Sequence, residues 1–271
     1  MFAIFLFLIL IPSVSLAGFE HENILNANID SPILDVTASA DGDLIFVLTP
    51  GSVLIYSTGN RTVMGRIPLD NKYDRIAYQN DDRLVITATK PSQIKIVRFS
   101  RIYDIDLTER AVLGSPEAKV TLVVFDDYQW PYCARLERYV QQLLGLFPKD
   151  LNYVVKHFPL SSHKFAYKSA MAALAAGKQG KFWQFHSKLL ENYKQINEEK
   201  IAEIAGVVGL NIEQFNIDRQ SEESKKVIQE DIENGKKIGV RGTPSVFLNG
   251  KRINNKDLKN LPDIIRHELN K

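Results

Sequence analysis

The sequence predicts two parts, an all-β module at residues 25–105 and an α/β domain at residues 115–271. Three observations predict this organisation. Strand-like runs repeat at an offset of 40 residues, a strand–helix–strand succession begins at Val120, and a cysteine lies near the start of that helix. With 271 residues, 45% of them hydrophobic, the chain is compatible with one or two domains and has ample apolar material for a core. A net charge of +2 gives no reason to expect nucleic acid as a partner.

The first 17 residues predict a secretory signal peptide. An apolar run from Met1 to Leu10 is followed by the small residues Ser15 and Ala17, which suit cleavage after Ala17. No positively charged segment precedes the run, and the alternatives are an uncleaved anchor and, less favoured, a buried core helix. A proline and a serine interrupt the run, so it is short for a membrane span. We therefore expect export to the periplasm or another extracytoplasmic space.

The all-β module consists of β-rich runs separated by turn signals such as Asp41-Gly42 and Pro50-Gly51. The offset pairs Asp41 with Asp81 and Leu44 with Leu84, and this period suits a four-stranded propeller blade. Two blades cannot close a propeller, which needs at least about four. We expect two small antiparallel sheets that lean on each other, on the second domain or on another subunit, and that serve for docking or spacing. The predicted strands are residues 44–48, 52–56, 83–87 and 94–97.

The α/β domain begins with a nearly continuous apolar run from Val120 to Phe125, as expected of a buried strand. Pro131 suits the first turn of the helix that follows, and a second strand is predicted at residues 151–155. Strand, helix and strand in this order form a βαβ unit with a right-handed crossover. The helix carries one apolar stripe, formed by Cys133, Leu136, Val140, Leu143, Leu144 and Phe147.

A helical block and a hairpin complete the predicted domain. Helices are expected at residues 162–176, from a cap at Asn197 to Gly209, after a capping box at Asn211, and from Ser221 to about Ile238. A strand at residues 245–248 is followed by Asn249-Gly250, a strong hairpin signal. The closing helix carries an apolar stripe of Leu258, Leu261, Ile264, Ile265 and Leu269.

The helix after the first strand opens with Trp130-Pro131-Tyr132-Cys133, and a cysteine at position 130 would make this C-P-Y-C, a dithiol redox motif. With this motif, with Phe158-Pro159-Leu160 and with Gly242-Thr243-Pro244, the chain resembles the DsbA-like branch of the thioredoxin superfamily over roughly residues 115–271. The resemblance implies a thioredoxin-like fold with a helical insertion at about 162–239. It also implies a thiol:disulfide oxidoreductase class without a cofactor, and a cis peptide bond before Pro244. The implied partners are extended or unfolded exported polypeptides and a redox partner protein.

In a C-x-x-C pair the first cysteine sits at the helix N-terminus, where its thiolate is stabilised, and the second resolves the mixed disulfide. Trp130 occupies the first position and Cys133 the second, with Pro131 and Tyr132 between them. Cys133 is the only cysteine, so no internal disulfide can form. Because Cys133 lies on the apolar stripe and free cysteines are usually buried, an inert core thiol is favoured over a reactive one.

Three functional hypotheses remain open from the sequence. The protein could retain thiol chemistry through Cys133 alone. It could be a redox-inactive relative that binds extended chains beside Thr243 and Pro244 by strand addition. Position 130 could instead be selenocysteine, since the tryptophan codon UGG is one base from UGA. Coding DNA separates the third hypothesis from the others.

Other titratable residues give weaker signals. His157, His186 and His267 show no metal-ligand spacing, so no metal is expected, and His163 could lie near the groove by resemblance. Asp126 and Asp127 are expected to be exposed loop carboxylates. No acid is expected inside the strand that ends at Phe125, where thioredoxins often bury a proton acceptor.

Overall fold

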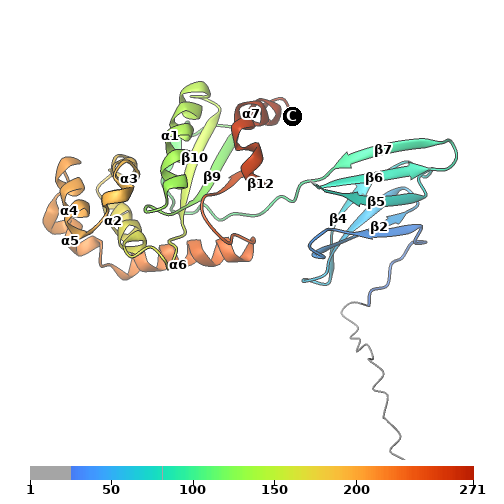
Figure 1. Ribbon diagram of the computed structural model, residues 1–271, viewed down its shortest axis with the longest axis horizontal. Helices are drawn as coiled ribbons and strands as arrows, with labels where there is room; N and C mark the ends of the chain where they lie inside the picture. Colours follow the sequence, from blue (N-terminus) through green and yellow to red (C-terminus); the bar gives the residue numbers. More distant parts are fainter. Residues whose placement is uncertain (1–25, 81) are drawn as a thin grey trace, which may run out of the picture. The chain divides into compact units, whose positions relative to one another are not determined.

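The computed structural model describes residues 26–80 and 82–271, and the chain divides into two compact units after Phe99 (Figure 1). The predicted signal peptide lies outside the described residues. Among the described residues, no helix has the length and apolar character that crossing a membrane requires.

The first unit consists of two antiparallel sheets (Figure 1). The four-stranded sheet has the order β1-β2-β3-β4 and the three-stranded sheet the order β5-β6-β7. The sheets share one core, in which Phe46 and Leu48 of one sheet lie in the same cluster as Leu84 and Ile86 of the other. The expectation of two small sheets leaning on each other is confirmed, and no propeller is formed by the described residues. The strands are β1 (Asp35–Ala38), β2 (Leu44–Thr49), β3 (Ser52–Ser57), β4 (Thr62–Pro68), β5 (Arg75–Gln79), β6 (Arg83–Ala88) and β7 (Gln93–Arg98).

The four strands predicted individually correspond to β2, β3, β6 and β7. β1, β4 and β5 were not predicted individually, because none of them carries an apolar run as long as those of β2 and β3. β4 contains Gly65 and Arg66, and it pairs with β3 across an irregularity at Ile55/Tyr56. These strands are held by their neighbours rather than by a strong pattern of their own.

The second unit is built on a five-stranded mixed sheet of order β12-β11-β9-β10-β8. The parallel pair β9 (Val120–Asp126) and β10 (Leu151–His157) is joined by α1 (Pro131–Leu146), which confirms the βαβ unit. The antiparallel strands are β8 (Val112–Gly114), β11 (Ser245–Leu248) and β12 (Lys251–Ile253). The hairpin at Asn249-Gly250 is confirmed.

Helices cover both faces of this sheet (Figure 1). Side chains of α1 and α7 (Leu261–Leu269) pack with Leu122 and Val124 on one face, and Ile232 and Ile238, from and just after α6, pack with Val123 and Phe125 on the other. This alternation along β9 follows from the two-residue period of a strand. The sheet is therefore buried on both sides.

The inserted helical block is confirmed, with α2 (Ala166–Lys178), α3 (Phe182–Glu191), α4 (Glu198–Val207), α5 (Ile212–Asp218) and α6 (Glu222–Lys237). Asn197, Asn211 and Ser221 act as N-caps as predicted, each accepting a backbone hydrogen bond. The predicted start of α2 at residue 162 is wrong. Residues before Ala166 form turns instead, and Phe165 N donates to the side chain of Gln129.

The closing helix also begins later than its apolar stripe suggests. Leu258 lies in a short 3₁₀ segment (Asn255–Asn260), and α7 begins at Leu261, followed at once by Pro262. A proline fits the first helical turn because its missing N–H has no intrahelical partner there.

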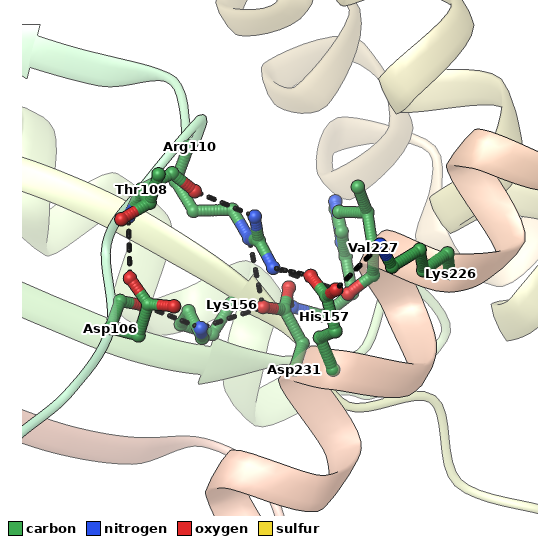
Figure 2. Close-up of polar contacts among 9 residues, drawn as sticks. Asp106, Thr108, Arg110, Lys156, His157, Lys226, Val227 and Asp231 are labelled. Atoms are coloured by element: carbon green, nitrogen blue, oxygen red, sulfur yellow. Dashed lines mark hydrogen bonds and ion pairs between the residues drawn. The ribbon is translucent and has the colours of Figure 1, made fainter.

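Residues 106–110, near the start of the second unit, are held against its sheet by a buried ion cluster (Figure 2). Asp231 Oδ1 on α6 accepts from Arg110 Nε at 2.9 Å and lies 2.8 Å from Lys156 Nζ, while Oδ2 accepts from His157 N at 2.8 Å. Lys156 Nζ also donates to the carbonyl of Asp106 at 2.7 Å. The cluster thus joins this segment, β10 and α6 at one point.

Candidate functional site

The N-terminus of α1 carries the motif residues. Trp130 is the N-cap residue with extended backbone, Pro131 is the first helical residue, and Cys133 N donates to Trp130 O at 3.1 Å. Trp130 is half-buried and its ring centroid lies 5.3 Å from that of Tyr132, whose side chain is exposed. The aromatic pair therefore marks the surface where a dithiol motif would present its first thiol.

Cys133, in the first turn of the same helix, is buried, with 2% of its surface exposed. Burial raises the pKa of its thiol well above the ordinary value, and the neighbouring Asp126 carboxylate raises it further. The prediction of a buried thiol packed into the core is confirmed. A thiol in this setting stays protonated and is a poor nucleophile.

Two predictions about the adjacent carboxylates are wrong. Asp126 is the last residue of β9 and Asp127 follows it, and both are buried rather than exposed. The strand does contain an acid, because β9 extends one residue beyond Phe125. Burial raises the pKa of Asp126 to about 6, partly opposed by the attraction of His186 and by the Cys133 thiol. Asp126 Oδ2 has no hydrogen-bond partner among the described residues.

Asp127 has a different role, because it organises the loop in front of α1. Its Oδ1 accepts from Gln129 N at 2.8 Å, and its Oδ2 accepts from Leu160 N at 2.7 Å and lies 3.0 Å from His163 Nδ1. The His163 ring centroid lies 5.5 Å from that of Trp130. His163 is therefore placed beside position 130, as the resemblance suggested.

The Thr243–Pro244 peptide bond is cis, as predicted, and this loop lies opposite the motif. Together they border a groove of about 650 Å³. Thr243 Oγ1 is buried and has no hydrogen-bond partner among the described residues. All six residues proposed from the sequence (Trp130, Pro131, Tyr132, Cys133, Thr243, Pro244) thus gather at one end of the domain. The groove is lined by Trp130, Tyr132, Arg135, Leu136, Tyr139, Thr243, Pro244, Asn255, Leu258 and Lys259.

A buried polar network behind the motif was missed by sequence reasoning. Glu137 Oε2 lies 3.0 Å from His186 Nε2 and accepts from Tyr153 Oη at 3.0 Å, while His186 Nδ1 lies 3.0 Å from Tyr128 Oη. Burial alone would raise the pKa of Glu137, but the attraction of His186 and several hydrogen bonds lower it to about 2. A signal existed, because Glu137 stands four residues after Cys133 on an otherwise apolar stripe.

No group of three or more His, Cys, Asp or Glu residues in the described part of the chain could hold a metal ion. At the α1 N-terminus the structure places one buried thiol, the buried Asp126 carboxyl and an aromatic surface.

A family model described as Thioredoxin matches residues 107–267. Among curated proteins, the Na(+)/H(+) antiporter NhaA 1 of Mycolicibacterium gilvum (strain PYR-GCK) is 32% identical over 170 residues, or 62% of this chain. The NhaA 1 antiporter of Salinispora arenicola (strain CNS-205) is 35% identical over 142 residues. The matched regions are 27% and 22% of those proteins, so the chain spans only about a quarter of their length.

Solved structures resemble the second unit. A thioredoxin-like oxidoreductase from Silicibacter pomeroyi DSS-3 is 32% identical, with a TM-score of 0.52, and the match covers 59% of this chain and 94% of that one. BdbD from Bacillus subtilis has a TM-score of 0.57 at 22% identity, covering 64% of this chain and 99% of that one. The catalytic domain of Proteus mirabilis ScsC has a TM-score of 0.52 at 24% identity, covering 60% and 90%. The last two show likeness of fold alone.

Proposed function

The chain belongs to the thioredoxin family, whose model matches residues 107–267, and we propose that it is an extracytoplasmic, peptide-binding member of the thiol:disulfide oxidoreductase class. Its groove between Trp130 and Pro244 binds extended segments of exported polypeptides, and the wild-type chain performs no dithiol exchange. The observation that carries this proposal is an open groove lined by Trp130, Tyr132 and Pro244, at a helix N-terminus whose only thiol is buried.

The thiol count argues against turnover by the wild-type chain. Dithiol exchange needs one thiolate to attack the client disulfide and a second to resolve the mixed disulfide. Attack by Cys133 would form a bond between Cys133 and one client sulfur and release the other client sulfur as a thiolate. With no other cysteine in the chain, that mixed disulfide has no internal thiol to break it.

The groove has the features of a peptide site. Tyr132 is 54% exposed, and with Trp130 it offers aromatic surface that binds with little loss of side-chain freedom. Arg135 and Lys259 add positive charge to the lining. Extended segments that combine apolar and acidic residues fit this surface best. The apolar N-terminal pattern of the sequence supports an extracytoplasmic location.

Binding is tested with a fluorescein-labelled extended peptide of apolar and acidic residues, titrated with the wild type, Tyr132→Ala and Tyr167→Ala. Tyr167 is the matched control, an aromatic residue 41% exposed on α2 and outside the groove lining. Tyr132→Ala should raise Kd by roughly tenfold, as expected for an aromatic contact, and Tyr167→Ala should leave it unchanged. Equal effects of the two substitutions would contradict the groove assignment.

Redox competence is tested by insulin reduction. The wild type should show no turnover above a control without protein, whereas Trp130→Cys should gain activity. The new thiol would sit at the N-cap of α1, three residues before Cys133, where the helix dipole favours its thiolate. Stability of the variant is measured by denaturant unfolding, because loss of a large aromatic side chain can cost about 3–5 kcal/mol when it is fully buried. Wild-type turnover would refute the redox-inactive part of the proposal.

A second candidate, selenocysteine at position 130, is favoured by the position of His163. This imidazole is hydrogen-bonded to Asp127 and lies beside residue 130, where a basic ring and a helix N-terminus would stabilise a selenolate or thiolate. The coding DNA tests this candidate directly. A UGA codon at position 130 would support it, and UGG would contradict it.

A further inference from the structure

The two sheets of the first unit come from one sequence repeat, but the second sheet is one strand short. At the offset of 40 residues, β1 corresponds to β5, β2 to β6 and β3 to β7. The strand equivalent to β4 would lie at residues 102–108, yet the described three-stranded sheet ends at β7. The first sheet therefore has a fourth strand where the second sheet has an edge.

Residues 102–108 do not serve as that strand because they are bound elsewhere. Ile102 forms a β-bridge with Lys251, and Tyr103 N donates to Gly250 O at 2.9 Å. Farther along, Asp106 O accepts from Lys156, and Arg110 is ion-paired with Asp231 (Figure 2). The segment thus belongs to the second unit, and its backbone groups are used there.

The two edges of the three-stranded sheet differ. At β5, Ile76 N donates to Asp35 Oδ2 at 3.0 Å and Tyr78 N donates to Thr37 Oγ1 at 3.1 Å, so side chains of β1 satisfy this edge. At β7, no strand among residues 26–80 and 82–271 pairs with the outer edge. Ile94 and Ile96 are 69% and 59% exposed there. β7 contains neither a proline nor a bulge, two devices that usually protect edges.

The charge around β7 is of one sign. No Asp or Glu occurs between Asp82 and Asp104, whereas Lys90, Lys95 and Arg98 do. We propose that the outer edge of β7 binds an extended, acidic segment of a partner polypeptide, which becomes the fourth strand of this sheet. Main-chain hydrogen bonds supply affinity in such strand addition, and cross-strand side chains supply preference. A second copy of the chain fits less well, because the charged side chains that two paired β7 edges bring together would all be positive and would repel each other.

This edge lies in the first unit, so the proposal is independent of the groove beside Trp130. It is tested with the full chain and a fluorescein-labelled octapeptide of alternating glutamate and valine, using a lysine–valine peptide of the same length for comparison. The glutamate peptide should bind, with affinity falling as salt is raised, and the lysine peptide should not. Hydrogen exchange should show new protection in β7 and none in β5.

Arg98→Glu and Arg75→Glu form a matched pair of variants. Both arginines are exposed on edge strands of the same sheet, Arg98 on the open β7 and Arg75 on the capped β5. Arg98→Glu should weaken peptide binding by roughly three- to tenfold, and Arg75→Glu should not. The proposal is overturned if the glutamate peptide fails to bind, if both variants lose affinity equally, or if protection appears outside β7. It is also overturned if the chain alone forms a dimer that protects β7.

Discussion

Two buried aspartates in the second unit occupy opposite kinds of environment. Asp231 is fully buried on α6. Its Oδ1 contacts the cations of Arg110 and Lys156, and its Oδ2 accepts a backbone N–H. Asp126, at the end of β9, faces a thiol and leaves Oδ2 without a hydrogen-bond partner among the described residues. Both carboxylates are excluded from water, yet only the first has cations in direct contact.

The difference shows how one fold uses the same side chain in two ways. A buried charge with cations and N–H donors around it fixes the elements that supply them, here α6, β10 and the segment at Arg110 (Figure 2). Among the described residues, Asp126 has a single N–H donor, Asp127 N, and no cation in contact, and burial raises the pKa of its carboxyl to about 6. Asp231 therefore holds three elements together, whereas Asp126 is a carboxyl that can hold a proton beside Cys133.

Asp231→Asn should produce the largest effect. The substitution preserves size but leaves Lys156 and Arg110 buried without their shared counter-charge, which typically costs about 3–5 kcal/mol. Denaturant unfolding measures the loss. Glu230→Gln is the matched control, because Glu230 also contacts Arg110, at 3.3 Å, but its side chain is 48% exposed. The control should lose less than about 1 kcal/mol. Similar losses of unfolding free energy in both variants would show that the buried cluster around Asp231 does not hold these elements together.

Asp126→Asn should change the pH dependence of stability. The folded-state pKa of about 6 lies above the ordinary value of 3.8, so the wild type is most favoured below pH 4 and loses this contribution as pH rises through 6. The difference between an ordinary pKa of 3.8 and a folded-state pKa of about 6 corresponds to roughly 3 kcal/mol. The asparagine variant lacks this titration. The stability difference between variant and wild type should therefore move in favour of the variant by that amount between pH 4 and 7.

Unfolding curves at pH 4, 5, 6 and 7 for both proteins test this expectation. The difference between the two proteins isolates Asp126, because Glu137, whose pKa is about 2, titrates in both. A difference that stays constant over this range would mean that the Asp126 carboxyl has the same pKa in the folded and unfolded chains, and would contradict the raised pKa.

Sequence patterns predicted most of the second unit, because many of its elements carry a local signal, whereas the short strand β8 was not predicted. Pro131 starts α1, Asn197 and Ser221 cap helices, and Asn249-Gly250 closes a hairpin. The gathering of Trp130, Cys133 and Pro244 at one end also followed from the motif and the family resemblance. These features depend on a few neighbouring residues.

What the sequence did not predict depends on contacts between distant residues. The burial of Asp126 and Asp127 results from β9 running one residue farther and from Leu160 and His163 closing over the loop. The cluster around Asp231 joins residues 121 positions apart. Neither contact leaves a periodic trace in the chain. Exposure of a charged residue is a sound default only until the tertiary partners are known.

The smallest predicted effect concerns the influence of Asp126 on Cys133. Burial is the larger cause of the raised thiol pKa, and the Asp126 charge is the second. Removing that charge should therefore lower the thiol pKa and increase its reactivity only slightly. Native Cys133 should react with iodoacetamide at pH 8 at least about 100-fold more slowly than in denaturant. Asp126→Asn should accelerate the native reaction by less than about tenfold, because the sulfur stays buried in the variant. Both proteins should react equally fast when denatured, which serves as the control. Mass spectrometry of timed samples gives the rates. Fast labelling of the native wild type would show an accessible thiol and favour single-thiol chemistry. A large acceleration in the variant would show that the Asp126 charge, rather than burial, is the main cause of the raised Cys133 pKa.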